Sequence, residues 1–503
     1  MHLSDVVAAS AAVAATRSRS AKAAILADLL RRTATECPDD IATVTSYLAG
    51  ALRQRRTGLG WRSLRDAPEP SATPVLTVSE VHETFEHLAS LAGAGSQRAR
   101  AEATARLLGR ATADEQRWLR SIVTGEVRQG ALDSLVQDGL AIAGGVPPAS
   151  VRRAAMMAGS TIDVATAALT GGEEALAAFV LAVGRPVLPM LASTAPTVEA
   201  AMAKAGGGDV AIDTKLDGVR IQVHRSGDDV LVVTRSLDDV TSRHPEVVAV
   251  ARALDCTTVV LDGEVLALGT DGRPRPFQET ASRAASMTGV ELTPAFFDIL
   301  HLDGRDLVDV PTATRLAALE SVVPERYRVA RLVTADVAEA ESFAAGALDL
   351  GHEGVVVKSL AAPYAAGRRG ATWVKVKPVH TLDLVVLAVE RGSGRRSPWL
   401  SNIHLGARDG DEFVMLGKTF KGMTDEILAW QTERFRELEV SDDGYVVTVR
   451  PEQVVEIAFD GVQRSTRYPG GVALRFARVV RYRDDKTPAE ADTIETVRAH
   501  LGA

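Results

Sequence analysis

The chain has 503 residues, which is too long for one ordinary hydrophobic core, so we expect two to four domains. Hydrophobic residues make up 46% and charged residues 24%, as in soluble globular proteins, and no apolar run approaches the roughly 20 residues of a membrane helix. The net charge of -8 alone argues against a nucleic-acid partner. Cys37 and Cys256 are too few and too far apart in sequence for a disulfide framework or a four-cysteine zinc site, and this low cysteine content fits a reducing cytoplasm.

The first part of the chain, up to about residue 180, has a helical pattern. It is rich in Ala and Leu, and apolar residues recur at three- and four-residue spacing. The apolar stretch 6–15 has the length of a signal-peptide core, but Asp5 precedes it and no basic segment does, so we expect a helix of the mature protein. The pattern changes near Pro186, which predicts an all-α domain over residues 1–184.

Beyond Pro186 short β-rich runs alternate with helical segments, which predicts an α+β domain over residues 185–380. The predicted strands are 210–212, 219–223, 230–234, 258–268, 295–300, 354–358 and 373–376, and the predicted helices are 247–254 and 338–348. Further short strands follow at 384–389, 404–407, 412–416, 446–449 and 454–459. Short strands at that spacing predict a small β-barrel over residues 381–503.

Binding to a nucleic acid needs a local basic surface rather than a basic total, so the distribution of charge matters. Arginines crowd a short stretch around Trp61, and a second basic group lies late in the chain. The first cluster is Arg53, Arg55, Arg56, Arg62 and Arg65, and the second is Arg391, Arg395, Arg396, Lys418 and Lys421. Each cluster could contact phosphates or could equally be a solvated loop.

Residues 215–220, Lys-Leu-Asp-Gly-Val-Arg, place an amine, a carboxylate, a glycine and a guanidinium in an otherwise apolar strand pattern. A lysine amine attacks phosphorus only in its neutral form, which desolvation or a nearby cation such as Arg220 favours. Gly218 lets the backbone turn tightly beside a ligand. This is the composition of a covalent nucleotidyl-transfer site with Lys215 as nucleophile, although an exposed hairpin with solvated charges explains these residues equally well.

Two later strands carry carboxylates into apolar sequence. Asp262 and Glu264 interrupt one predicted strand, and Glu353 begins another that ends in Lys358. An unpaired buried carboxylate is costly, so Glu264 needs a magnesium ion, a sugar hydroxyl or a cationic neighbour. A hairpin turn at residues 262–263 is the alternative.

Cations and an aromatic residue also interrupt the later strands. Lys375 and Lys377 lie two residues apart and so share one strand face, where like charges repel unless an anion such as phosphate lies between them. A solvated edge strand is the alternative, and Arg368 and Arg369 add charge just upstream. Phe297 could stack on a base, although core packing is the more common use of phenylalanine.

The C-terminal segment 475–486 is densely basic. It holds Arg475, Arg478, Arg481, Arg483 and Lys486. This density suggests a mobile element that orients phosphates.

In chain order, these segments resemble the nucleotidyl-transferase motif series of the ATP-dependent DNA ligases. The motifs are KLDGVR at 215–220, TRSLDDVT at 234–241, LDGEVLAL at 261–268, FFDIL at 296–300, EGVVVK at 353–358, WVKVKP at 373–378 and RYRDDK at 481–486. The resemblance covers essentially the whole chain and is nearest to the stand-alone bacterial members. It implies a helical DNA-binding domain at 1–184, an adenylation (nucleotidyltransferase) domain at 185–380 and an OB-fold domain at 381–503.

The resemblance also implies a role for each matching residue. Lys215 would attack the α-phosphate of ATP and become a lysine–AMP phosphoramidate. Contacts to the nucleotide and its phosphates would come from Asp213, Arg220, Arg235, Glu264, Phe297, Arg369, Lys375, Lys377, Arg483 and Lys486. Among these, Arg220 and Arg235 would also hold the nick 5′-phosphate, Phe297 the adenine ring, and Arg483 with Lys486 the departing pyrophosphate. Glu353 would bind magnesium, and Glu264 the ribose or the metal.

One position departs from the family pattern. The family usually has glutamate two residues before the lysine, where this chain has Asp213. If that position reads adenine through its backbone, the shorter side chain changes little. If the side chain takes part, the affinity or the choice of nucleotide changes.

Other families with this lysine chemistry match less well. An NAD-dependent DNA ligase would carry a four-cysteine zinc module, and an mRNA-capping guanylyltransferase or an RNA ligase would not carry a helical domain of this size. An inactive DNA clamp would not need the retained lysines and glutamates. We therefore expect a cytoplasmic, monomeric enzyme that uses ATP and Mg²⁺, closes around nicked duplex DNA, and recognises its backbone and shape rather than its sequence, with no membrane partner.

Overall fold

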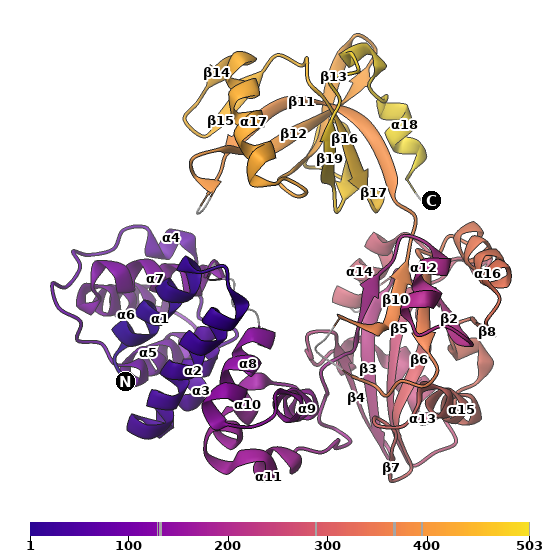
Figure 1. The fold of residues 1–503 in the computed structure, drawn as a ribbon, viewed down its shortest axis with the longest axis horizontal. Coiled ribbons are helices and arrows are strands. Elements are labelled where there is room, and N and C mark those ends of the chain that lie inside the picture. Colours follow the sequence, from indigo (N-terminus) through magenta and orange to yellow (C-terminus); the bar gives the residue numbers. More distant parts are fainter. Residues whose placement is uncertain (128, 130–132, 287–288, 366–368, 394–395, 502–503) are drawn as a thin grey trace.

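The computed structural model describes residues 1–127, 129, 133–286, 289–365, 369–393 and 396–501. The chain forms three lobes in sequence order: a helical lobe, a lobe of two sheets with helices, and a β-rich lobe (Figure 1). No helix within these ranges is long and apolar enough to cross a membrane.

The helical lobe confirms the prediction that the first part of the chain is helical. Its helices are α1 (Leu3–Ala15), α2 (Arg19–Glu36), α3 (Ile41–Leu48), α4 (Trp61–Leu64), α5 (Val78–Ser90), α6 (Ser96–Arg110), α7 (Ala113–Thr124), α8 (Asp133–Gly144), α9 (Pro148–Ala158), α10 (Thr161–Thr166) and α11 (Gly172–Ala177). Thr77 and Glu80 form a capping box that starts α5. Helices α2 and α8 pack closely, because Gly139 faces Leu26 and a Cβ there would lie 3.0 Å from the Leu26 Cβ.

The middle lobe contains two five-stranded sheets. The first has the order β1-β10-β9-β2-β8, built from β1 (Leu191–Thr194), β2 (Val210–Lys215), β8 (Arg331–Thr334), β9 (Gly354–Ser359) and β10 (Arg369–Val376). The second has the order β4-β3-β5-β6-β7, built from β3 (Val219–Ser226), β4 (Asp229–Thr234), β5 (Thr258–Ala267), β6 (Leu292–Leu302) and β7 (Arg305–Asp306).

Helices pack against each of these sheets. Those on the first sheet are α12 (Val198–Lys204) and α16 (Val337–Asp349), and those on the second are α13 (Pro245–Arg252), α14 (Phe277–Ala285) and α15 (Thr312–Val322). The predicted strands and helices of this region are all present, and the α+β prediction is confirmed. The prediction missed α12, α14, α15 and the short strands β1, β7 and β8. Strands β1 and β8 lie at the two edges of the first sheet, and β7 lies at one edge of the second. Strands this short carry too few residues for the alternation to be recognised.

The C-terminal lobe is built around the long strand β11. Its elements are β11 (His380–Arg391), β12 (Leu400–Asp409), β13 (Glu412–Thr419), α17 (Asp425–Glu437), β14 (Glu439–Asp442), β15 (Val446–Val449), β16 (Val454–Phe459), β17 (Gly461–Arg464), β18 (Val472–Arg475), β19 (Arg478–Tyr482) and α18 (Ile494–Ala499). Strand β11 pairs with β12, β15 and β16 in a seven-stranded sheet. The five predicted strands are present, but the prediction missed β14, β17, β18, β19, α17 and α18. Helix α17 was missed although Thr424 caps it and Leu428 and Phe435 bury one face. Only residues 377–379 separate β10 from β11 and join this lobe to the middle one.

One ion pair lies wholly inside the middle lobe. Both Arg315 on α15 and Asp298 on β6 have no exposed side-chain surface, and two guanidinium nitrogens contact the two carboxylate oxygens at 2.8 and 3.1 Å. Arg315 also donates to the carbonyl oxygens of Val310 and Ala362. This pair fastens α15 onto the second sheet.

Removing one member of this pair should destabilise the middle lobe strongly. Arg315→Met leaves the Asp298 carboxylate buried without its cation, and we expect a loss of about 3–5 kcal/mol in the free energy of unfolding, measured by urea denaturation. Arg305→Met, at an exposed arginine of β7, serves as the matched control and should change little. A loss below about 1 kcal/mol for Arg315→Met would contradict this role.

Candidate active site

The six-residue motif KLDGVR forms the turn between two strands that belong to different sheets. Lys215 ends β2, Gly218 lies in the turn, and Arg220 is the second residue of β3. A Cβ on Gly218 would lie 2.3 Å from the Val265 carbonyl oxygen and 3.0 Å from the Glu264 Cγ of β5. Glycine is therefore required here because the turn passes directly against the neighbouring strand.

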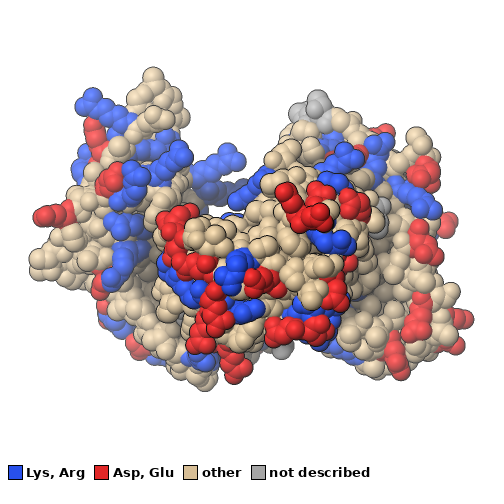
Figure 2. All heavy atoms as spheres, turned by 90° about the horizontal axis from the view of Figure 1, so that it is seen from above, with Lys and Arg blue, Asp and Glu red and all other residues tan. Residues whose placement is uncertain are grey.

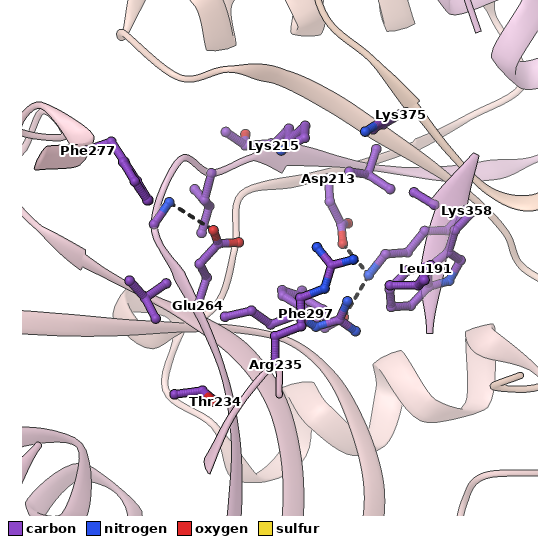
Figure 3. A pocket seen from close by; sticks show the side chains of 18 of the residues that line it. Leu191, Asp213, Lys215, Thr234, Arg235, Glu264, Phe277, Phe297, Lys358 and Lys375 are labelled. Atoms are coloured by element: carbon purple, nitrogen blue, oxygen red, sulfur yellow. Dashed lines mark hydrogen bonds and ion pairs between the residues drawn. The ribbon is translucent and has the colours of Figure 1, made fainter. Parts of the chain in front are cut away.

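A cavity of about 710 Å³ lies between the two sheets beside this turn (Figure 3). Its volume falls within the roughly 300–1,000 Å³ typical of ligand sites. Of the residues predicted for the site, those that line it are Asp213, Lys215, Arg220, Arg235, Glu264, Phe297 and Lys375. Other lining residues, for which the sequence predicts no role at the site, include Phe277, Lys358 and Trp373; of these, only Lys358 stands out in the sequence, as the charge that ends an apolar strand. The fold thus brings together most of the separate motifs.

The Lys215 amine forms an ion pair with the Glu353 carboxylate, which directly precedes β9. The backbone N–H of Glu353 also donates to the Lys215 carbonyl oxygen at 3.0 Å, so the two residues are held together twice. Lys377 lies 3.4 Å from the other carboxylate oxygen. Burial would raise the pKa of Glu353, but the charges and hydrogen bonds of Lys215 and Lys377 outweigh it and lower that pKa below its ordinary value.

Glu264 on β5 lines the same cavity as Lys215, and its carboxylate has a different pKa shift from that of Glu353. Its Oε1 accepts a hydrogen bond of 2.8 Å from the Gly218 backbone N–H, shown in Figure 3. Burial raises the pKa of Glu264 to about 7, although Lys215 and the Gly218 N–H oppose the shift. The two glutamates beside the lysine therefore differ in charge near neutral pH, since Glu353 is ionised and Glu264 is half protonated.

Arg220 lines the cavity but already has partners. Its guanidinium binds both carboxylate oxygens of Asp262, at 3.0 and 2.6 Å, and donates to the Met190 carbonyl oxygen at 2.6 Å. The hydroxyl of Tyr364 donates to Asp262 at 2.7 Å and accepts the Met190 N–H at 2.9 Å. The pKa of Arg220 is raised because the attraction of Asp262 outweighs burial. Sequence reasoning missed Tyr364, which lies 102 residues from Asp262.

Aromatic side chains and a buried carboxylate form another part of the cavity. The rings of Phe297 and Trp373 meet edge to face, with centroids 5.9 Å apart, and the Lys358 amine lies 4.7 Å from the first ring and 4.2 Å from the second. Asp213 pairs with Lys358 at 2.7 Å and with Arg331 on β8. No pattern in the sequence indicates Arg331, because only strand pairing brings it to this place.

The remaining predicted residues lie elsewhere. Arg483 and Lys486 are not among the residues that line the cavity; both pair with Asp383 of β11, at 3.2 and 2.6 Å. Lys377 contacts Glu353 and also pairs with Asp460. The side chain of Arg369 and the whole of Arg368 lie outside the described residues.

A different arginine of the C-terminal lobe contacts the motif turn. Arg475 binds both carboxylate oxygens of Asp217, at 2.6 and 3.1 Å, and lies 4.8 Å from the centroid of the Phe277 ring. In the described part of the chain, no group of three or more His, Cys, Asp or Glu side chains is placed to hold a metal ion by itself.

Comparisons with known proteins match the whole chain. Three family models match: "DNA ligase N terminus" over residues 62–141, "ATP dependent DNA ligase domain" over 189–377 and "ATP dependent DNA ligase C terminal region" over 396–486. A "Probable DNA ligase" of Nocardioides sp. (strain ATCC BAA-499 / JS614) is 70% identical over 504 residues, covering 99% of each chain, and one of Kineococcus radiotolerans is 64% identical over 501 residues, covering 99% of each. The solved structure "Pmar-Lig_PreS3" matches 95% of this chain and 99% of its own with a TM-score of 0.63 at 17% identity, which concerns the fold alone.

The raised pKa of Glu264 predicts a pH-dependent stability. An unfolded glutamate ionises near pH 4.5, whereas folded Glu264 keeps its proton up to about pH 7, so the folded state binds more protons between these values. The free energy of unfolding of the wild type should therefore fall, relative to that of Glu264→Gln, by about 1–3 kcal/mol as the pH rises from about 4.5 to 7. Urea denaturation across this range measures it. Glu291→Gln, at an exposed glutamate, should show no such trend, and a pH-independent difference for Glu264→Gln would contradict the raised pKa.

Proposed function

Because this chain belongs to the ATP-dependent DNA ligase family, we propose that it seals nicks between a 5′-phosphate and a 3′-hydroxyl in duplex DNA through a lysine–AMP intermediate on Lys215. The observation that carries the proposal is the position of Lys215 on the wall of a nucleotide-sized cavity, where its amine pairs with the ionised Glu353 carboxylate and interacts with the Glu264 carboxylate, whose pKa is raised. No observation favours a capping guanylyltransferase, an RNA ligase or an inactive clamp over this function.

In the first step, the neutral Lys215 Nζ forms a bond to the α-phosphorus of ATP, and the bond from that phosphorus to the bridging oxygen breaks. Pyrophosphate leaves, and the amine loses its proton to solvent. Since Glu353 stabilises the charged amine, Lys215 must leave this ion pair before it can attack. AMP then passes from the lysine to the 5′-phosphate of the nick. The 3′-hydroxyl displaces it in the last step and closes the strand.

Fixed cations support this chemistry, because charge develops on the non-bridging phosphate oxygens during transfer. Arg220, Arg235 and Lys375 line the cavity and are assigned to the phosphates of ATP and of the nick. Lys377, which follows β10, is assigned to the same phosphates. Arg369 keeps its assigned phosphate contact as an expectation, since its side chain lies outside the described residues. Phe297 is assigned to the face of the adenine ring.

The carboxylates of Glu264 and Glu353 fit a magnesium ion, since both are hard oxygen donors beside Lys215 and Mg²⁺ commonly takes one or two protein carboxylates together with substrate phosphates. When bound, such an ion offsets the negative charge on the phosphate oxygens. Glu353 is ionised and available for this role, while Glu264 must first lose its proton or instead donate to the ribose.

We assign the three lobes to three domains: a helical DNA-binding domain over residues 1–184, an adenylation domain over 185–380 and an OB-fold domain over 381–503. In the present arrangement of the lobes, Arg483 and Lys486 pair with Asp383. Their assigned role on the pyrophosphate therefore requires the C-terminal domain to turn and to break the contact between Arg475 and Asp217.

The first basic cluster is proposed as a DNA contact of a cytoplasmic, monomeric enzyme that reads backbone and shape. Arg55 pairs with Asp238 in the motif at 234–241, which places the helical loop next to the adenylation domain, and Arg56, Arg62 and Arg65 are exposed. Lys and Arg side chains gather around the hollow between the lobes (Figure 2).

Three members of the second basic cluster are already engaged within the C-terminal lobe, while Lys421 is exposed and lies near the Phe476 ring. Arg391 pairs with Asp442, Lys418 with Glu390, and Arg396 donates to backbone carbonyls, while Arg395 lies outside the described residues. It is therefore a weaker candidate for DNA contact than the first cluster.

Labelling of the protein tests the nucleophile. The protein is incubated with Mg²⁺ and α-labelled ATP, GTP or NAD, and we expect label on the protein from ATP alone. Lys215→Ala should remove the label because it removes the attacking amine, whereas Lys204→Ala, at a lysine of α12 outside the cavity lining, should not. Labelling from GTP in place of ATP, or wild-type labelling of Lys215→Ala, would refute the proposal.

A charge substitution tests the role of the helical domain. The triple variant of Arg56, Arg62 and Arg65 to Ser should bind nicked duplex DNA more weakly. The slope of log affinity against log salt should become shallower by about 0.9 for each phosphate that the variant no longer neutralises. Labelling by ATP should be unchanged.

A triple variant with the same reduction in charge, at exposed Arg252, Arg305 and Arg326 of the middle lobe, is the control for this experiment. Equal effects of the two triple variants on DNA affinity would show that total charge, not this surface, determines binding.

A further inference from the structure

The Asp213 carboxylate is held by two cations at the cavity. Arg331 binds it with two nitrogens, at 2.5 and 2.8 Å, and Lys358 contacts Oδ2 at 2.7 Å. The side chain of Asp213 is 3% exposed, and that of Arg331 11%. Burial would raise the pKa of Asp213, but Lys358 and Arg331 outweigh it and lower that pKa, so the carboxylate stays ionised.

Strand register brings Arg331 to this position. Asp213 on β2 lies directly opposite Arg331 on β8, and side chains of opposed residues share one face of a sheet. Lys358 comes from β9, on the other side of β2. Of these three residues, Asp213 and Lys358 line the cavity and Arg331 does not. Arg331 can therefore affect a bound ligand only through the Asp213 carboxylate that it holds.

Both cations also connect this carboxylate to the opposite sheet. Arg331 and Lys358 each donate to the Phe297 carbonyl oxygen at 3.0 Å. The ring of Phe297 lines the same cavity. The position of an aromatic wall and the orientation of a carboxylate acceptor are therefore fixed by the same two side chains.

We propose that Arg331 is a positioning residue for recognition of the nucleobase, which holds the Asp213 carboxylate so that it accepts a hydrogen bond from the exocyclic amino group of adenine. A carboxylate only accepts hydrogen bonds, so it pairs with the 6-amino group of adenine and repels the 6-carbonyl oxygen of guanine. The aspartate is one methylene shorter than the glutamate usual at this position, and the two-point contact with Arg331 holds it in one orientation. This inference rests on the proposed use of ATP by Lys215.

The test measures Lys215 labelling at varied ATP and GTP concentrations. Arg331→Gln leaves Asp213 with one cation and without its two-point contact, so we expect the KM for ATP to rise about tenfold and the ratio of kcat/KM for ATP over GTP to fall about tenfold, with kcat changed less than about twofold. Arg326→Gln, at an exposed arginine between α15 and β8, is the control, and its KM for ATP and its ratio of kcat/KM for ATP over GTP should match those of the wild type.

Two further variants separate positioning from a merely structural role. Asp213→Asn should lower the ATP over GTP ratio on its own, and the double variant with Arg331→Gln should be little worse than either single one, because both act on one contact. Fully additive effects would overturn the proposal, as would an unchanged ATP over GTP ratio in folded Arg331→Gln.

Arg331→Lys covers the case in which Arg331→Gln does not fold. It keeps the charge next to Asp213 but removes the fork of two donors, so we expect the KM for ATP and the nucleotide ratio to lie between those of the wild type and Asp213→Asn. Wild-type values for Arg331→Lys would refute the need for the two-point contact. Absence of label on the wild type with ATP would instead refute the proposed function, so the two failures differ.

Discussion

The pairing of Lys215 with Glu353 is the interaction on which the rest of the site depends. A charge in a half-buried cavity needs a partner, and this pair joins the end of β2 to the start of β9, next to the register point where Lys215 faces Gly354. Because the two strands are hydrogen-bonded neighbours, the main chain of Lys215 cannot shift without the first sheet, whereas its side-chain amine can still leave the ion pair. Two further cations that line the cavity follow the same rule, since Arg220 has Asp262 and Lys358 has Asp213.

Much of the site was predictable because its motifs are local. Lys215, Glu264 and Lys375 interrupt apolar strands, and such an interruption is visible in the sequence alone. Strand β8 and its Arg331 were not predictable in this way. Arg331 lies 118 residues from Asp213, and nothing in a four-residue strand indicates which partner it will face. Residues that act through pairing across the sheet are therefore not found from local motifs, however regular those motifs are.

The large divisions of the chain could be predicted better than the arrangement of its lobes. Composition distinguishes the helical lobe from the β-rich ones, and the predicted change near Pro186 lies between α11 and β1. The basic segment at 475–486 was expected at the phosphates. In the structure it is divided, because Arg475 reaches the motif turn while Arg483 stays with Asp383. The same basic residues can make different contacts in different orientations of the C-terminal lobe. Their pattern in the sequence therefore does not show which orientation is occupied.

The short connection at residues 377–379 limits how far the C-terminal lobe can move from the middle lobe. Three residues span at most about 10 Å, so the C-terminal lobe can rotate about this point but cannot move far from the cavity. Its contacts with the middle lobe, such as that of Arg475 with Asp217, are then intramolecular, with an effective concentration in the millimolar range or above. Weak contacts are therefore enough to populate each orientation of the C-terminal lobe. The rate of exchange between these orientations depends on how fast the contacts break and form, and not on the protein concentration.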